Sequence, residues 1–423
     1  MNILVITRRS WSNNNNIGNT MTNLFMNLHG SEIHNLYFRS EKPQNNICKT
    51  IFQISEQQLI RNIFSHKPTG RDIYANTFNP DEIAKEETLY SQSKKNNLRL
   101  LWFIRELVWD CGNWKTKALI HYLHEINIDI VFMPVFGCYY PHKVLKFIKE
   151  QTNAKIVLFH ADDNYSLKQF SFSPLYWLYR FGLRRWVRRS VKMATINYCI
   201  SRIQITEYQK AFKKPCKLLY KGIEQRQFTG YSENERLKLV FTGNISSGRW
   251  KTLAIIGRGL QKMNKTSAIA QLIIYTATPM TKKMKQALLM DDTIKMMGQV
   301  PAASIPIIQN DADILIHVES FALKDKLEVR MSFSTKIVDY LEHGKCIFAV
   351  GPIDVASIDY LKKNDAAVIA TSDNDAIEKL SMIIRNPELR LEYAEKAWKC
   401  GQKNHNRTVI QERFYNDLAD LVS

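Results

Sequence analysis

The chain has no apolar run of the roughly 18 residues that a membrane-spanning helix needs. Its 7 cysteines are scattered along 423 residues, and no two of them form a CxxC pair. An odd, dispersed set predicts reduced thiols in a cytosol and argues against a disulfide framework or a zinc site. The start, MNILVITRRS, lacks the long apolar segment and the small-residue cleavage site of a signal peptide.

Acidic residues are few compared with basic ones, 40 against 59, which gives a formal net charge of +19. This excess predicts an anionic partner: a nucleotide, a nucleic acid or an acidic lipid surface. The chain has neither an RNP-like aromatic motif nor a clustered recognition helix, so we expect no nucleic-acid partner. Hydrophobic residues make up 45% of the chain, enough for a sizeable core in two or three domains.

The stretch from Asp311 to Gly351 predicts a parallel strand–helix–strand unit. Its first strand runs to Val318, a helix opens at residues 332–336 and ends at Gly344, and residues 346–350 form the next strand. Units of this type bind ligands at the carboxyl ends of their strands, beside the start of the helix.

Four polar residues fall at that position in the unit, namely Glu319 after the strand and Ser334, Thr335 and Lys336 at the helix start. Backbone N–H groups, two hydroxyls and a cation at a helix start suit a phosphate or diphosphate. An ordinary helix whose cap is the Ser334 or Thr335 side chain explains the same residues equally well.

The same alternation of elements runs along most of the chain and predicts an α/β fold with two doubly wound, Rossmann-like domains. Strands are expected at residues 3–6, 128–135, 155–160, 194–201, 217–220, 239–243, 271–275, 293–297, 314–318, 346–350 and 367–370. Residues 40–97 are polar and are interpreted as a variable insertion, and residues 225–238 as an interdomain linker. We place the N-terminal domain at residues 1–228, the C-terminal domain at 229–403, and a closing helix at 404–423.

A second group of polar residues follows the strand at residues 155–160. His160, Asp162 and Asp163 stand at its carboxyl end, where they could orient a sugar hydroxyl or transfer a proton. A polar loop that caps the next helix explains them as well, but their position at the functional edge of the sheet favours a site. Gly18 lies in the loop after the first strand, just before a helix, and is assigned with Asp163 to the acceptor side of the site.

The loop after the strand at residues 239–243 also faces a helix start. Gly243 ends the strand, residues 246–248 form a turn, and Arg249 and Lys251 lie at the next helix start. This pattern indicates a second phosphate-facing loop.

The segment from Ser173 to Lys192 carries six basic residues and no acidic one. On a helical wheel the cations cover one half and apolar or aromatic residues cover the other, which is typical of a helix at a membrane surface. A solvated basic face over an ordinary core face is the alternative. The basic half comprises Arg180, Arg184, Arg185, Arg188, Arg189 and Lys192, and the apolar half comprises Leu175, Tyr176, Tyr179, Leu183, Trp186 and Val187.

Residues 98–123 are expected to form two helices that break at Gly112. Trp109 and Trp114 on them could line an acceptor site, although packing in the core is the commoner use of such a face.

Several stretches together resemble the bacterial GT-B glycosyltransferases of family four, or group one, and chiefly those of capsule, exopolysaccharide and O-antigen assembly. The matching stretches are CISRIQITEYQKAF, LYKGIE, FTGNISSGRW, MMGQVPAASIP, ADILIHVE and SFSTKIVDYLEHGKCIFAVGP. The resemblance implies a GT-B architecture, with the two domains facing a central cleft, and a closing helix that packs back toward the N-terminal domain.

The resemblance also implies a nucleotide-diphosphate sugar held by the C-terminal domain. Gly243 matches the glycine of the donor loop, Asn244 stands where an arginine is usual, and Arg249 matches a diphosphate-binding lysine. Lys336 matches the residue before the nucleotide-contacting helix. Asp339 matches the second acid of a paired-glutamate motif, which contacts the ribose.

The first acid of that pair is replaced by Met331, and Glu319 is the candidate to take over its catalytic role. His160 falls near the family's histidine or aspartate on the acceptor side. Such enzymes generally need no bound metal, so no cofactor is expected. The DxD at residues 311–313 begins a strand instead of ending one, so it is interpreted as structural.

The implied function is transfer of a sugar from a nucleotide-diphosphate sugar to a growing glycan or polyprenyl-diphosphate-linked acceptor. The expected location is the cytoplasmic face of the cell membrane, on anionic lipid. A sugar-nucleotide 2-epimerase of the same fold is the alternative, and it needs no lipid acceptor. The basic aromatic helix at residues 173–192 favours the transferase.

Overall fold

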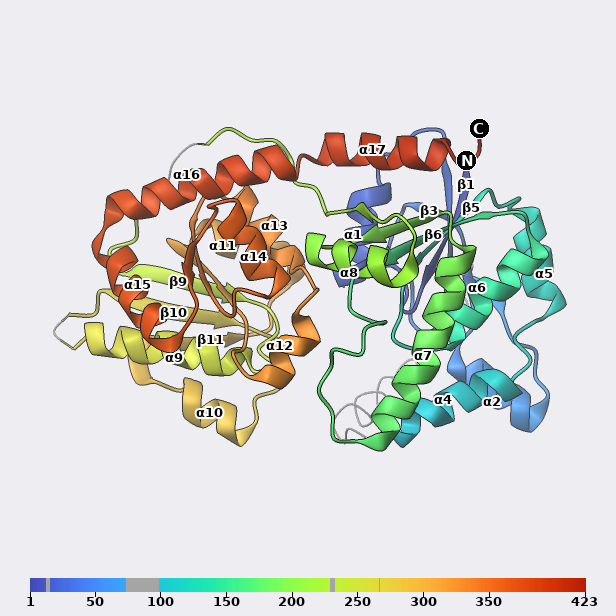
Figure 1. The fold of residues 1–423 in the computed structure, drawn as a ribbon, viewed down its shortest axis with the longest axis horizontal. Coiled ribbons are helices and arrows are strands. Elements are labelled where there is room, and N and C mark those ends of the chain that lie inside the picture. Colours follow the sequence, from blue (N-terminus) through green and yellow to red (C-terminus); the bar gives the residue numbers. More distant parts are fainter. Residues whose placement is uncertain (13–15, 74–98, 229–232, 266) are drawn as a thin grey trace. The chain divides into compact units, whose positions relative to one another are not determined.

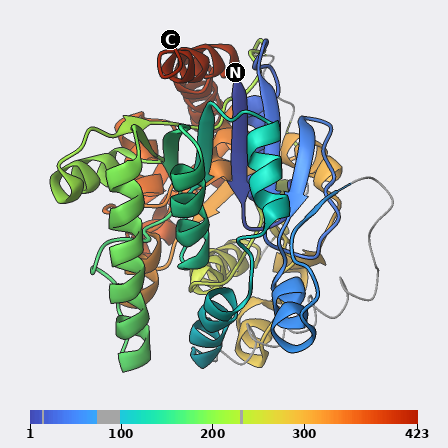
Figure 2. The same cartoon turned by 90° about the vertical axis from the view of Figure 1, so that its right-hand side faces the viewer.

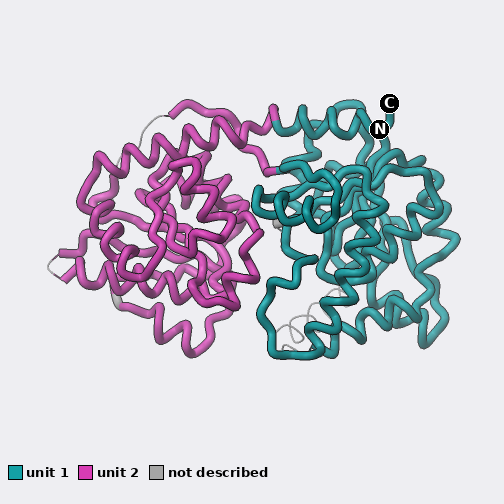
Figure 3. Tube along the Cα trace, viewed as in Figure 1, with its two compact units in different colours: residues 1–219, 410–423 teal, residues 220–409 magenta. Residues whose placement is uncertain are grey.

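The computed structural model describes residues 1–12, 16–73, 99–228, 233–265 and 267–423. The chain divides into two compact units (Figure 3). The first unit contains residues 1–219 and 410–423, and the second contains residues 220–409. The sequence placed these boundaries at 228/229 and 403/404, so each lies several residues away from the structural division.

The first unit is built on a sheet with the strand order β4-β3-β2-β1-β5-β6-β7-β8. Every neighbouring pair is parallel except β3 and β4. The central strands are buried on both faces because helices cover both sides of the sheet (Figures 1 and 2). The strands are β1 (Asn2–Thr7), β2 (Glu32–Tyr37), β3 (Cys48–Gln53), β4 (Arg71–Asp72), β5 (Ile130–Pro134), β6 (Lys155–His160), β7 (Ile196–Cys199) and β8 (Lys217–Leu218).

The helices of this unit follow the predicted alternation except α2, which lies in the segment that was interpreted as an insertion. The break at Gly112 is confirmed, because its N–H closes the end of α4 on Val108 before α5 begins. The helices are α1 (Asn16–Phe25), α2 (Glu56–Ser65), α4 (Leu100–Cys111), α5 (Lys117–Glu125), α6 (Tyr140–Gln151), α7 (Pro174–Met193) and α8 (Arg202–Phe212).

The chain's last helix, α17 (Arg407–Ala419), crosses the boundary at residue 410. Its Phe414 is buried in the first unit, with ring centroids 5.3 Å from Phe25 on α1 and 5.8 Å from Phe132 on β5. The closing helix is therefore part of this unit's aromatic core.

The interpretation of residues 40–97 as an irregular insertion is wrong where the structure describes them. Residues 48–72 supply β3, α2 and β4 to the sheet. The strand β3 lies next to the edge strand and is only partly buried, so it lacks the continuous apolar run of a central strand. Residues 74–97 lie outside the described part of the chain.

The second unit has a sheet with the order β11-β10-β9-β12-β13-β14, in which all neighbouring pairs are parallel. Its strands are β9 (Leu237–Thr242), β10 (Ala270–Tyr275), β11 (Ile294–Gly298), β12 (Ile314–Val318), β13 (Cys346–Val350) and β14 (Val368–Ala370). Its helices are α9 (Arg249–Met263), α10 (Lys282–Leu288), α11 (Ile305–Asn310), α12 (Leu323–Val329), α13 (Thr335–Glu342), α14 (Ala356–Lys363), α15 (Asp373–Arg385) and α16 (Pro387–Asn404), with short 3-10 turns η1 (Asp291–Thr293) and η2 (Ala302–Ser304).

The predicted strand–helix–strand unit is confirmed as β12, α13 and β13, with the two strands side by side and parallel. The extra segment before α13 folds into the short helix α12. Across the described ranges, no helix combines the length and the apolar composition that crossing a bilayer requires.

Candidate functional site

Two loops of the second unit meet at the carboxyl ends of the neighbouring strands β9 and β12. Gly243 follows β9 with a φ of 130°, and a Cβ there would lie 2.1 Å from the Nζ atom of Lys336. Gly248 begins α9 with a φ of 75°, and a Cβ there would lie 2.2 Å from the Oγ atom of Ser320. Both positions therefore favour glycine, because their positive φ values are ones that residues with a side chain rarely adopt.

Arg249 and Glu319 form a two-point ion pair at this edge. The Nε atom of Arg249 lies 2.9 Å from Oε2 of Glu319, and its Nη2 atom lies 3.1 Å from Oε1. The Glu319 side chain is only 3% exposed. Burial raises the pKa of Glu319, and the charge of Arg249 opposes that rise.

His317 lies two residues before Glu319 on β12, so both side chains point to the same face of the sheet. Burial lowers the pKa of His317 well below its usual value, and the charges of Lys336 and Arg249 lower it further. The imidazole is therefore neutral, and the 3.8 Å separation of its Nε2 atom from Glu319 is not an ion pair. The sequence analysis did not single out His317, which sits inside the apolar run of a strand.

Lys336 supplies the second cation of the site. Its Nζ atom lies 4.9 Å from the centroid of the Phe241 ring, and the side chain is half-buried. Burial lowers the pKa of Lys336 to about 8, and the charge of Arg249 acts in the same direction. Lys336 is therefore charged at neutral pH but close to its titration range.

Asp339 lies one turn after Lys336 on α13 and forms an ion pair with Lys221. The Lys221 side chain is 11% exposed and comes from the segment after β8. Sequence reasoning missed Lys221, although the LYKGIE stretch that contains it carried part of the family resemblance.

The hydroxyls at the start of α13 do not cap the helix, although capping was one of the two interpretations of these residues. Ser334 occupies the N-cap position, but no side chain caps this helix. The Ser334 N–H instead donates to the Oγ atom of Ser357 at 3.0 Å. The Ser334 and Thr335 hydroxyls are thus not used for capping, and their assignment to a donor stays a prediction.

Asn244 organises the loop between β9 and α9. Its Oδ1 atom accepts hydrogen bonds from the Ser246 N–H and the Thr278 hydroxyl.

The carboxylates of the DxD at residues 311–313 bind Lys238 and Asn234 through backbone and side-chain contacts. The DxD is therefore structural, as predicted.

In the first unit, His160 ends β6 as expected, but the surrounding side chains enclose it completely. Its ring lies 5.0 Å from Tyr208 and 5.9 Å from Phe212, and its Nε2 atom lies 3.4 Å from Oδ1 of Asn197. Burial lowers the pKa of His160 to about 4. Because contact with an acceptor requires access, this geometry does not support the predicted catalytic role of His160.

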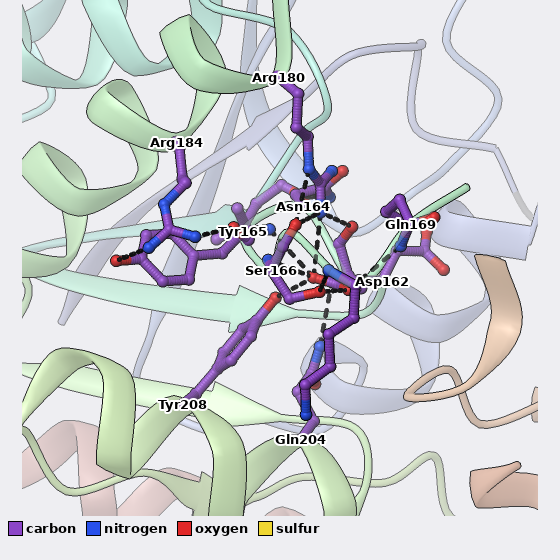
Figure 4. Close-up of polar contacts among 12 residues, drawn as sticks. Asp162, Asn164, Tyr165, Ser166, Gln169, Arg180, Arg184, Gln204 and Tyr208 are labelled. Carbon is purple, nitrogen blue, oxygen red and sulfur yellow. Dashed lines mark hydrogen bonds and ion pairs between the residues drawn. The ribbon is translucent and has the colours of Figure 1, made fainter. Parts of the chain in front are cut away.

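Asp163 is the centre of a network that fixes the loop after β6. Figure 4 shows its partners Ser166, Arg180 and Tyr208 close together. One of its oxygens accepts from the N–H groups of Tyr165 and Ser166 and from the Tyr208 hydroxyl, and it lies 3.2 Å from Arg180. Arg180 also donates to the Ser166 carbonyl. Asp163 therefore has a structural role, in contrast to the acceptor contact predicted for it.

Asp162 differs from its two neighbours because its side chain is exposed. Its carbonyl oxygen accepts from the side chain of Gln204 and from the Asn164 N–H (Figure 4). Of the three polar residues after β6, Asp162 is the one that a solvent-borne acceptor can reach.

Gly18 does not precede the first helix, as the sequence suggested, because α1 already begins at Asn16. A Cβ at Gly18 would lie 2.0 Å from the carbonyl oxygen of Ser12. Gly18 is therefore required for close packing of the preceding loop on the first turn of α1.

The basic helix α7 is only partly as predicted. Arg180 is buried in the Asp163 network, and the Arg184 guanidinium packs 4.3 Å from the ring centroid of Tyr165, so neither belongs to a free cationic face. The exposed cations are Arg185, Arg188, Arg189 and Lys192, with Trp186 half-buried beside them. Exposed apolar side chains gather at its other end: Phe172, Leu175, Leu178 and Phe181.

The positions described by the structure contain no group of three or more His, Cys, Asp or Glu side chains that could hold a metal ion. No family model matches the chain, and no curated protein sequence matches it either.

Solved structures, in contrast, match over nearly the whole chain. The Anabaena protein Alr3699/HepE in complex with UDP and glucose has a TM-score of 0.66 and 12% identity, with 99% of this chain and 100% of that chain covered. Sucrose-phosphate synthase from Thermosynechococcus elongatus has a TM-score of 0.65 and 10% identity, with 99% and 98% covered. The chain has the GT-B fold.

A third similar structure is WaaG, a glycosyltransferase involved in lipopolysaccharide biosynthesis, with a TM-score of 0.59, 11% identity, and 98% and 99% of the two chains covered. At such identities the likeness establishes the shared GT-B fold. The chemistry of this chain has to be argued from its own residues.

Proposed function

We propose that this GT-B protein transfers a sugar from a nucleotide-diphosphate sugar to a glycan acceptor. The observation that carries the proposal is the pair of cations, Arg249 and Lys336, at the carboxyl edge of β9 and β12 beside Gly243. Open α/β sheets bind ligands at this edge. A similar structure of the same fold contains UDP-glucose, which is consistent with such a donor.

In this proposal the two cations bind the diphosphate and stabilise it as it leaves the sugar. The Nε and Nη2 atoms of Arg249 both donate to the Glu319 carboxylate, so Glu319 fixes the guanidinium at the start of α9. We therefore propose a positioning role for Glu319 in place of the catalytic role suggested by the sequence. Asp339, one turn along α13, and its ion-pair partner Lys221 suit contacts to the nucleoside. No resident metal is expected.

The test is incubation of the full chain with UDP-, GDP- and ADP-sugars, with and without polyprenyl-diphosphate-linked glycan acceptors, followed by mass spectrometry. A transferase is expected to release nucleoside diphosphate and lengthen the acceptor, and the reaction should persist in EDTA. Conversion of the donor sugar to its 2-epimer without an acceptor would instead establish the epimerase. Absence of nucleotide binding by calorimetry would overturn the donor site itself.

The proposed acceptor is lipid-linked, and we place the protein on the cytoplasmic face of the cell membrane. Support comes from α7 and the segment before it, where Leu178 is 62% exposed and Phe172 is 90% exposed. Leu100, Ile104 and Leu107 form a second exposed apolar stripe on α4, which packs against α7. Exposed apolar side chains toward one end of a helix and exposed arginines toward its other end supply the two kinds of contact that helices make with anionic lipid.

Wild-type protein is expected to sediment with anionic vesicles at low salt and to be released at high salt. Each exposed Arg contributes about 1 kcal/mol of attraction that salt screens. Changing Arg185, Arg188 and Arg189 to Gln should therefore weaken binding strongly, and Leu178→Asp should weaken it at both salt concentrations. Arg184 is kept, because it packs on Tyr165. Equal sedimentation of the triple variant and wild type would contradict this membrane surface.

A further inference from the structure

A hollow of about 650 Å³ lies on the outer helical layer of the first unit, between the end of α4, α6 and α7. A volume of this size is typical of sites for small ligands. No residue of the proposed donor site contributes to it. Its lining consists of Trp109, Asp110, Gly112, Asn113, Trp114, Lys115, Lys143, Lys146, Phe147, Glu150, Trp186 and Arg189.

Aromatic rings and cations alternate along the wall of this hollow. Lys115 lies 5.3 Å from the centroid of Trp114 and 5.9 Å from that of Phe147. On the α7 side, Arg189 lies 4.8 Å from the centroid of Trp186. Each contact keeps a cation next to a ring face, where it stays available to an anion.

The lining has four cationic and two acidic side chains, an excess of two positive charges. Lys143 pairs with Asp110 at 2.5 Å, and Lys146 pairs with Glu150 on the next turn of α6. Neither Lys115 nor Arg189 forms an ion pair with an acid among the residues that the structure describes, and both are exposed. An anion in the hollow would therefore meet cations on two of its sides.

Trp109 lines the hollow, and it is fully buried and stacked on Tyr140 with ring centroids 4.3 Å apart. Its indole Nε1–H has no hydrogen-bond acceptor among the described residues. Buried donors usually have a partner, so an unpartnered donor on a residue that lines the hollow is consistent with a bound oxygen-rich ligand.

We propose that this hollow binds an anionic saccharide, one or two sugar rings that carry a carboxylate or phosphate. The rings supply flat apolar surface for the C–H face of a sugar, and the cations bind its acidic group. The anionic character follows from the charge of the lining. The choice of a saccharide rests on the proposed glycosyl transfer, in which the hollow would hold part of an acceptor glycan.

The concave shape favours a discrete glycan over a lipid surface. The exposed apolar side chains proposed to meet the membrane, on α4 and at the start of α7, do not line the hollow. The lining also includes α6, which contributes Lys143, Lys146 and Phe147 but no exposed large apolar side chain. A flat anionic membrane would not contact these α6 residues.

Calorimetric titration of the full chain with trigalacturonate tests the proposal without any sugar donor. Wild type should bind trigalacturonate, lose that binding at high salt, and bind neutral maltotriose at least about tenfold more weakly. The Lys115→Ala/Lys146→Ala variant should lose about tenfold or more in affinity, because it removes the charge of Lys115 and leaves Glu150 in the hollow without the cation that pairs with it. Arg185→Ala/Arg188→Ala is the matched control, since it removes two exposed cations of α7 that do not line the hollow.

Equal affinity of wild type for trigalacturonate and maltotriose would overturn the proposal, as would equal losses in the two double variants. Loss of vesicle binding, but not of trigalacturonate binding, in Lys115→Ala/Lys146→Ala would assign the hollow to lipid. Because these titrations need no turnover, they can fail while glycosyl transfer is observed, and they can succeed when it is not.

Discussion

Arg249→Met is expected to lower the free energy of unfolding of the second unit by about 3–5 kcal/mol. The substitution leaves the Glu319 carboxylate, whose side chain is 3% exposed, without the guanidinium that holds both of its oxygens. Replacing both partners by Met should recover much of the loss, because apolar side chains of similar size tolerate burial. Urea unfolding of wild type, both single variants and the double variant gives the coupling energy as a double-mutant cycle.

Lys251→Met is the matched control, because Lys251 lies half a turn along α9 with an exposed side chain. Its loss should stay within about 0.5 kcal/mol. Two results would contradict the structural role of the ion pair. One is a urea-unfolding midpoint of Arg249→Met equal to that of wild type, and the other is a loss of unfolding free energy in the double variant equal to the sum of the losses in the two single variants. If the Arg249 variant is unstable, weak nucleotide binding by that variant can result from loss of the folded state. Such weak binding would then not show that Arg249 contacts the diphosphate.

The strands that the sequence predicted best are those buried on both faces. β6, β12 and β13 have the predicted bounds, because helices cover both sides of the sheet and all their side chains except that of Lys155 are buried. The strands β2 and β3 were missed. In β2 (EIHNLY) the buried polar residues His34 and Asn35 interrupt the apolar run, and in β3 (CKTIFQ) the outer half is only partly buried, so polar and apolar residues are mixed. Periodicity identifies a strand only where its two faces have defined environments.

The position of the donor site was also predictable, since strand ends and helix starts fix which loops converge. The sequence could not predict which side chain at a strand end is accessible to a ligand. His160 and Asp162 are two residues apart, yet one is enclosed and the other exposed. The difference is set by Tyr208 and Phe212 on α8, which lie far along the sequence and close over His160.

Arg180 illustrates the same limit on α7. The helical wheel assigned it to the solvent face, but the helix is 20 residues long and packs on different partners along its length. The Arg180 guanidinium points inward and forms an ion pair with the buried carboxylate of Asp163. A basic residue counted as surface charge is thus part of the fold, and the cationic surface of α7 is smaller than its sequence suggests.

Lys336→Met is expected to lower kcat with a nucleotide-sugar donor about 100- to 1000-fold, the usual effect of losing one group that stabilises developing charge. Nucleoside-diphosphate affinity should also fall by about tenfold or more, because a charge-assisted contact is lost. The fold should tolerate the change, since Lys336 is half-buried over Phe241 and a methionine fills the same space. Steady-state kinetics and calorimetry measure the two effects separately.

The pH profile distinguishes a diphosphate contact from a structural role. The pKa of Lys336 is lowered to about 8, so its proton is present below that pH and is lost above it. Wild-type affinity for UDP should therefore weaken as the pH rises through about 8, whereas Lys336→Arg should retain its charge and show a flatter profile up to higher pH. Bound diphosphate favours the charged lysine, so the transition should shift upward in the complex. A flat wild-type profile, or an identical slope in Lys336→Arg, would show that Lys336 does not bind the diphosphate and that Arg249 alone carries the donor site.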